Sequence, residues 1–204
     1  TRRGGRPCPV PGADTRAAGD LAREEDWAGG LTGVDAVVHL AARVHHMGEG
    51  TGPEALEHHR RVNVAGTRRL AQGAAAAGVR RFVFLSTIKV NGERTPGRPF
   101  RADDPPAPAG PYAVSKLEAE RALWSLAGAG GPGFVVIRPP LVYGPGVGGN
   151  LERLMAAVQR GWPLPLGALE APRTLVAVDN LVDLIEHCLS HPDAPGEVFL
   201  AGDA

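Results

Sequence analysis

The chain has 204 residues, with 22 acidic and 22 basic side chains, so its formal net charge is zero. This length fits one domain, or one and a fraction. The balanced charge gives no sign of a nucleic-acid or membrane-surface partner, and the apolar runs are too short to cross a bilayer. Its two cysteines, Cys8 and Cys188, are far apart in the sequence, so we expect reduced and structurally incidental thiols.

The predicted elements alternate between strands and helices. Residues 34–42 (VDAVVHLAA) form an apolar run typical of a strand that is buried on both faces of a parallel sheet. A long helix is predicted from Pro53 to about Ala77, because Pro53 can open it and Gly78 can end it. The other predicted strands are residues 13–18, 82–87, 134–138, 176–178 and 198–200, and the other predicted helices are residues 24–31, 112–127, 151–160 and 181–189.

This alternation indicates βαβ units and therefore an α/β fold with an open, doubly wound parallel sheet. In such sheets, ligands bind outside the carboxyl ends of the strands. Polar residues follow several of the predicted strands, namely Asp20, His39, Thr87 and Arg138. We expect the chemistry of the protein at that edge of the sheet.

Tyr112 and Lys116 lie four residues apart on a predicted helix, which places the phenol and the ammonium on one helical face. A nearby cation favours the phenolate, so we expect Lys116 to lower the pKa of Tyr112 and make it an acid/base. Ser86 and Thr87 end the preceding strand. The Thr87 hydroxyl is expected to hold the substrate oxygen whose proton Tyr112 exchanges, with Ser86 as the alternative. These groups suit hydride transfer to and from a carbinol carbon.

In this order and spacing, the motifs resemble those of the extended short-chain dehydrogenase/reductase family, in particular its nucleotide-sugar epimerases, dehydratases and 4-keto reductases. Thr87, Tyr112 and Lys116 match the catalytic groups of that family. Asn63 matches the helix Asn that braces the active-site strand. The resemblance implies a Rossmann-type parallel sheet.

The same resemblance implies NAD as the cofactor, with NADP as the alternative, and a nucleotide sugar as the substrate. Residues 1–145 would form the cofactor-binding domain, and residues 146–204 would form part of a substrate-binding region interleaved with its last elements. The positions matched to cofactor contacts are Asp20, Leu21, Leu40, Ala41, Ala42, Tyr112, Lys116, Pro139 and Pro140. The positions matched to substrate contacts are Thr87, Lys89, Asn150 and Arg173.

The chain also departs from the family pattern. The glycine-rich strand–turn–helix that seats the pyrophosphate is absent, so we expect a fragment that lacks its first βαβ unit, binds cofactor poorly and leaves a sheet edge uncovered. Ile88-Lys89 replaces the Asp-Glu pair of the 4,6-dehydratases, which disfavours water loss. Asn91 stands where a tyrosine is usual, and Leu141 stands where many epimerases have an asparagine.

The predicted function is an NAD(P)-dependent 4-epimerase that acts on a UDP-hexose or UDP-N-acetylhexosamine by transient hydride transfer at C4. The alternatives are a 4-keto-6-deoxyhexosamine nucleotide reductase of surface-polysaccharide synthesis and a non-catalytic dinucleotide-binding sensor. No metal site is predicted, because the pairs His45-His46 and His58-His59 can each supply one ligand to a site. We expect a cytoplasmic protein, and the family analogy suggests a homodimer.

Overall fold

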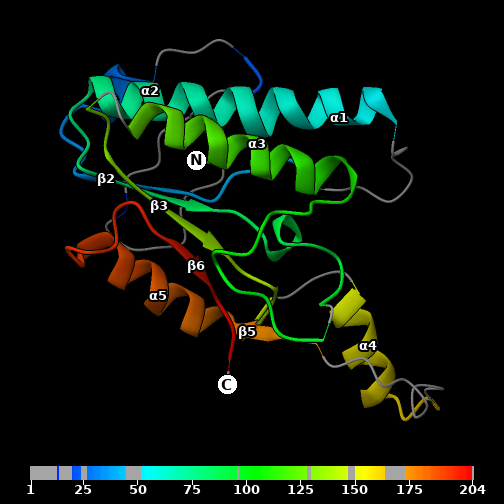
Figure 1. The fold of residues 1–204 in the computed structure, drawn as a ribbon. Coiled ribbons are helices and arrows are strands. Elements are labelled where there is room, and N and C mark those ends of the chain that lie inside the picture. Colours follow the sequence, from blue (N-terminus) through cyan, green and yellow to red (C-terminus); the bar gives the residue numbers. More distant parts are fainter. Residues whose placement is uncertain are drawn as a thin grey trace.

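The structure is a computed structural model, and it describes residues 13, 20–23, 27–44, 52–95, 97–127, 130–146, 150–163 and 173–203. Its main sheet has four parallel strands in the order β1-β2-β3-β6. These strands are β1 (Ala36–His39), β2 (Arg81–Leu85), β3 (Gly133–Arg138) and β6 (Val198–Leu200). Helices α1 (Pro53–His59), α2 (Thr67–Ala76) and α3 (Gly110–Ala127) cover one face of the sheet, and α5 (Val178–Ser190) covers the other (Figure 1). The predicted doubly wound α/β class is confirmed.

The two central strands are apolar on both faces because each face has its own core. Phe82 and Phe84 of β2 point into the core beneath α2 and α3, whereas Val83 between them points into the core beneath α5. The same alternation continues in β3, where Phe134 and Val136 lie in the first core and Val135 and Ile137 lie in the second. A strand with helices on both sides therefore reads as an unbroken apolar run.

The predicted long helix has the expected ends but an unexpected middle. Pro53 lies in its first turn, and Gly78 follows its end with φ +75°, a left-handed conformation that glycine adopts without strain. Between α1 and α2, residues Arg60–Gly66 form a π-helix. Such segments are rare and are frequently found at functional sites.

Several predicted boundaries differ from the structure by one to three residues, and two regions differ more. The strand predicted at residues 34–42 covers four residues, and its Val38 is 36% exposed rather than buried, because β1 lies at one edge of the sheet among the described strands. The break at Pro139-Pro140 is followed by a further strand, β4 (Leu141–Tyr143), which pairs in parallel with β5 (Leu175–Ala177). This pairing joins segments far apart in the sequence, so local pattern gave no sign of it.

Other predictions lie partly outside the described residues. Most of the strand predicted at residues 13–18 falls there, and the helix predicted at residues 24–31 is described as a short 3₁₀ turn at Gly29–Leu31. Helix α4 (Asn150–Gln159) lies apart from the main sheet (Figure 1). Within the described part of the chain, no helix is both long and apolar enough to span a bilayer. The domain division at residue 145 stays a prediction.

Candidate active site

Lys116 is buried at the centre of the candidate site. It points from α3 toward the carboxyl end of β2, where its Nζ donates a hydrogen bond to the carbonyl oxygen of Leu85 at 2.7 Å. The ammonium also lies 3.9 Å from the ring centroid of Phe84, a cation–π contact. Burial lowers the pKa of Lys116 from 10.5 to about 7, with the nearby Glu120 acting in the opposite direction. Lys116 is therefore a group that can titrate near neutral pH.

Tyr112 lies one helical turn before Lys116 and is half-buried. Its ring packs edge-on against the buried ring of His59 in α1, with centroids 6.1 Å apart. Burial raises the pKa of this phenol above its usual value. The expectation that Lys116 lowers the pKa of Tyr112 is therefore wrong. Burial of the phenol sets the direction of the shift, and the Lys116 ammonium is hydrogen-bonded to the Leu85 carbonyl.

Ser86 and Thr87 differ in what their hydroxyls contact. Ser86 is buried, and its hydroxyl donates a short hydrogen bond to the Glu120 carboxylate. Thr87 begins the turn into the short helix η3 (Ile88–Val90), where its Oγ1 accepts a weak bond of 3.3 Å from the Lys89 amide. η3 packs against α3, which carries Tyr112. Of the two hydroxyls, that of Thr87 is the one left to bind a ligand.

Asn63 lies in the π-helix and joins two parts of the site. Its Oδ1 accepts the Arg43 amide at 2.7 Å, and its Nδ2 donates to the Arg43 carbonyl at 3.0 Å and to Ser115 Oγ at 2.9 Å. The Ser115 hydroxyl in turn donates to the carbonyl oxygen of Tyr112 at 2.8 Å. Asn63 thus braces the segment after β1 and the first turns of α3, rather than the strand that ends at Thr87.

A buried polar network that the sequence analysis did not identify lies behind these groups. Arg138, at the end of β3, donates from Nε and Nη2 to the two oxygens of Glu120 at 3.0 and 2.6 Å. Its Nη1 donates to Asn91 Oδ1 at 3.0 Å. Glu120 is four residues beyond Lys116 on an otherwise small and apolar helix face, and that spacing was the available signal. The network ties α3 to the carboxyl ends of β2 and β3.

The matched cofactor positions after the predicted first strand form a turn held against the long helix. The Asp20 carboxylate accepts the Ala22 amide at 3.1 Å, and the Leu21 carbonyl accepts a bond from Arg69 Nη2 at 2.7 Å. The Leu21 carbonyl also lies 2.8 Å from where a side chain on Gly66 would begin, so a glycine is required there. This close approach fixes the position of Asp20 beside the helix.

The remaining matched cofactor positions follow β1 and β3. Leu40 is 58% exposed, Ala41 is exposed and Ala42 is half-buried. Pro139 is buried, with Pro140 beside it half-buried, and the Pro139 carbonyl accepts the Ile88 amide at 2.9 Å. Exposed apolar side chains at a strand end are a surface that a planar ligand can cover.

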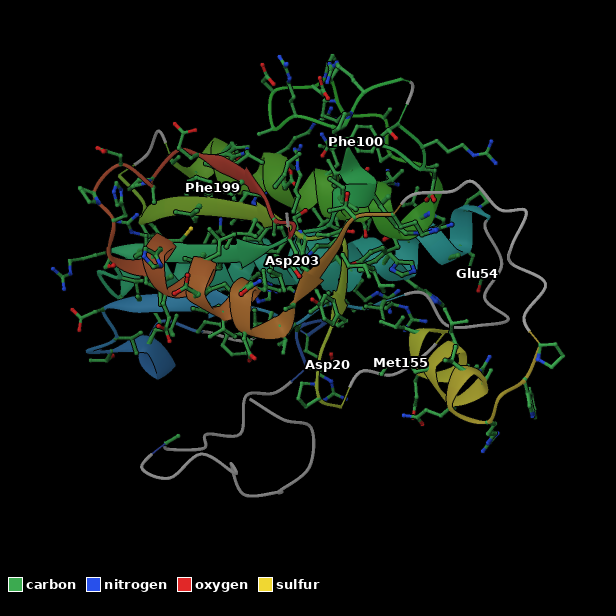
Figure 2. The ribbon with its side chains drawn as sticks, turned by 90° about the horizontal axis from the view of Figure 1, so that it is seen from below. Asp20, Glu54, Phe100, Met155, Phe199 and Asp203 are labelled. Carbon is green, nitrogen blue, oxygen red and sulfur yellow. The ribbon has the colours of Figure 1, made fainter. Side chains whose placement is uncertain are left out.

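The matched substrate positions come from different elements: Thr87 and Lys89 lie together at η3, whereas Asn150 belongs to α4 and Arg173 precedes β5. Lys89 Nζ pairs with Glu93 at 3.3 Å on the surface of η3. Arg173 is exposed. Asn150 opens α4, and its side chain lies outside the described residues. Figure 2 shows Met155 on the same helix, set apart from the sheet.

The described residues fit a dinucleotide cofactor along the carboxyl edge of the sheet. The edge offers a carboxylate at Asp20, an exposed apolar surface at Leu40 and a buried cationic donor at Lys116. These are the group types that bind an adenine amino group, a flat ring and a ribose hydroxyl. Figure 2 labels Asp20 and also Asp203, which follows the carboxyl end of β6.

Comparisons with known proteins agree with this arrangement. Over 187 residues the chain is 46% identical to the UDP-glucose 4-epimerase of Vibrio cholerae. The aligned region covers 91% of this chain and 57% of that protein. It is 29% identical over 215 residues to a 3-beta-hydroxysteroid dehydrogenase of Mycolicibacterium neoaurum, covering 97% of this chain and 57% of the relative. The chain thus spans a little over half the length of these relatives.

A solved structure and a family model support the same fold and the same family. The structure of MoeE5 in complex with UDP-glucuronic acid and NAD is 30% identical and superposes with a TM-score of 0.78, covering 97% of this chain and 66% of that one. A sequence model described as the NAD dependent epimerase/dehydratase family matches residues 2–202. The prediction of NAD as the cofactor is confirmed at the level of the family. The chain belongs to the NAD-dependent epimerase/dehydratase family.

Proposed function

We propose that this chain carries the catalytic groups of an NAD-dependent nucleotide-sugar 4-epimerase. The observation that supports the proposal most is the packing of η3, which follows Thr87, against the helix that carries Tyr112 and Lys116. This packing brings two hydroxyl-bearing elements and a buried ammonium to one edge of the sheet. The 46% identity to a UDP-glucose 4-epimerase indicates the substrate class.

The proposed roles follow from the contacts of each group. Thr87 would hold the C4 oxygen of the sugar, and Tyr112 would exchange a proton with that oxygen. The C4 hydroxyl would give its proton to the Tyr112 phenolate as the hydrogen on C4 departs as hydride with the two electrons of its bond, which leaves a 4-keto sugar. Return of a hydride to the opposite face, with the proton going back from Tyr112 to oxygen, gives the epimer with no net oxidation. NAD supplies the hydride acceptor and donor in this chemistry.

The pKa values suggest how Tyr112 would change between the two half-reactions. Burial raises the pKa of Tyr112 above its usual value, so near neutral pH the phenol is protonated and can donate a proton, as reduction of a 4-keto sugar requires. Taking up the C4 proton needs a cation next to the phenolate. Lys116, one helical turn away, would supply that charge if its ammonium moved from Leu85 toward the phenol.

The test is an epimerisation assay on the purified full-length protein with UDP-glucose, with product sugars separated by chromatography and NADH followed by absorbance. We expect an epimeric product without net NADH formation. Oxidation of NADPH with a 4-keto sugar alone would instead support the one-way reductase. Absence of turnover with both substrates, despite bound NAD, would support the sensor.

The chain offers a matched pair of tyrosines for the mutational arm. Tyr112→Phe removes the proposed acid/base, and we expect the rate to fall by about 10²–10⁴-fold. Tyr143→Phe removes the chain's other phenol, which lies on β4 and donates a hydrogen bond to Asp203 at 2.8 Å. We expect this variant to change the rate by less than about tenfold. Similar rates for Tyr112→Phe and the unmodified protein would overturn the proposed mechanism.

A further inference from the structure

The loop at residues 97–109 connects the two catalytic elements. It lies between η3, which follows Thr87, and the start of α3, two residues before Tyr112. Figure 2 shows Phe100 on this loop, away from the sheet. Because the loop is attached at both ends to these elements, we expect it to border a pocket that contains the two hydroxyls. Its position would then affect how much room a sugar has there.

The loop has its own internal ion pair. Arg98 donates from Nη1 and Nη2 to the two carboxylate oxygens of Asp104, at 3.1 and 2.5 Å. The same carboxylate accepts the Arg101 amide at 2.7 Å. The Arg98 guanidinium holds the pKa of Asp104 below its usual value. These bonds fix the shape of the loop but do not fix where it lies on the protein.

Three contacts attach the loop to the protein core. Asn91 Nδ2 donates to the Arg101 carbonyl at 2.9 Å, and the Ala107 amide donates to the Val90 carbonyl at 3.0 Å. The Phe100 ring lies 3.3 Å from where a side chain on Gly92 would begin, and Gly92 has φ +147°. The Asn91 side chain is itself buried, at 3% exposed, whereas its partner Arg101 lies on the exposed loop.

The opposite end of the Asn91 amide is bonded to the active-site network. Its Oδ1 accepts Arg138 Nη1, and Arg138 is held in turn by both oxygens of Glu120. Arginine can only donate and a carbonyl can only accept, so the two partners fix the orientation of the Asn91 amide. A group with both a donor and an acceptor end is needed between them. Neither an aspartate nor an aliphatic side chain supplies both.

We propose that Asn91 is a positioning residue of the substrate pocket, which fixes the 97–109 loop to the buried Glu120–Arg138 pair and thereby sets the room for hexose substituents beside Thr87 and Tyr112. The loop-positioning part depends on the contacts of Asn91 alone. The substrate part rests on the proposed epimerase function. The two parts are separated by measuring loop exchange and kinetics on the same variants.

The first variant is Asn91→Asp in the full-length protein. It keeps the side-chain shape and the acceptor for Arg138, but it places a carboxylate oxygen against the Arg101 carbonyl. We expect amide hydrogen exchange in residues 97–109 to quicken by at least tenfold. For UDP-glucose we expect KM to rise by about five- to tenfold with kcat changed less than threefold. The ratio of kcat/KM between UDP-glucose and UDP-N-acetylglucosamine should also change at least threefold.

The second variant guards against misfolding of the first. Ala107→Pro removes the hydrogen bond from the Ala107 amide to the Val90 carbonyl and leaves the buried network intact. The neighbouring Pro106 and Pro108 already favour the backbone conformation that proline needs. We expect the same direction of change in exchange and in KM. Ser125→Ala is the control, since that hydroxyl is exposed and donates to the carbonyl one turn earlier on α3.

Each outcome has one meaning. Unchanged exchange in Asn91→Asp overturns the positioning of the loop. Faster exchange with an unchanged KM and an unchanged substrate ratio overturns its role in the pocket. If the unmodified protein has no epimerase activity, the proposed function fails, whereas the exchange measurement still decides whether Asn91 holds the loop.

Discussion

The carboxyl edge of the sheet has two halves that differ in how their side chains are covered. At the ends of β2 and β3, the polar groups Ser86, Lys116, Glu120 and Arg138 are buried and hydrogen-bonded to one another or to backbone. Beyond the end of β1, Leu40 and Val44 are apolar yet 58% and 51% exposed. The first half is held by its own contacts, whereas the second presents surface that a ligand can cover.

This difference indicates which parts of the site are organised before any ligand binds. The buried half fixes the helix that carries Tyr112 by an ion pair and a network that water does not reach. The β1 half is shaped by backbone contacts, such as that of Leu21 on Gly66, and its apolar side chains Leu40 and Val44 are exposed where a ligand can contact them. Changes in the first half should therefore affect stability, and changes in the second should affect NAD binding.

The largest expected effect comes from breaking the buried ion pair. Glu120→Gln leaves the Arg138 guanidinium buried without its carboxylate, which should lower the free energy of unfolding by about 3–5 kcal/mol. The matched control is Glu118→Gln on the same helix, whose pair with Arg60 is partly exposed and should contribute far less. Urea denaturation measures both. Equal losses would mean that burial does not distinguish the two pairs.

The next effect is a pH dependence carried by Lys116. Because burial lowers its pKa from 10.5 to about 7, the folded protein holds fewer protons on this group than the unfolded chain between those pH values. The free energy of unfolding should therefore rise with pH across that window, by up to about 1.4 kcal/mol per pH unit. Lys116→Met should remove this rise. Denaturation series at pH 7, 8 and 9 that show the same slope in both proteins would contradict the assignment.

A smaller effect is expected in the β1 half from filling the space at Gly66. A methyl group there would begin 2.8 Å from the Leu21 carbonyl, so Gly66→Ala should push away the turn that holds Asp20. We expect about 1–3 kcal/mol of lost stability and weaker NAD binding, measured by calorimetry. Gly29→Ala is the control, because no atom lies within 4 Å of its added methyl group. Unaltered NAD affinity in Gly66→Ala would argue against Asp20 as a cofactor contact.

The smallest effect on stability should come from the exposed surface itself. Leu40→Ser ought to change the free energy of unfolding by no more than about 0.5 kcal/mol, because the side chain is already largely in water. It should nevertheless weaken NAD binding several-fold. Val158→Ser on α4 is equally exposed, at 60%, and should alter neither property. A similar loss of NAD affinity in both variants would remove Leu40 from the cofactor surface.

The sequence by itself determined the fold class and the positions of most helices and strands. Alternating apolar runs and helical segments predicted a doubly wound sheet, and the span 198–200 was predicted with the boundaries that β6 has. These features are local, since each depends on residues within one strand or one helix. The spacing of Tyr112 and Lys116 likewise follows from helix geometry alone. Their assignment as catalytic residues stays a prediction, which the Tyr112→Phe assay tests.

Only the tertiary structure decided how the site is held and charged. The sequence could not show how far the Tyr112 phenol is buried, and so the predicted direction of its pKa shift was wrong. It favoured Thr87 over Ser86 by the family pattern alone, because the partner of Ser86 is 34 residues away on α3. It also missed the pairing of β4 with β5 and the hydrogen bond that Arg138 donates to Asn91. Burial and long-range hydrogen bonds set pKa values and the availability of side chains, and both arise when distant segments pack together.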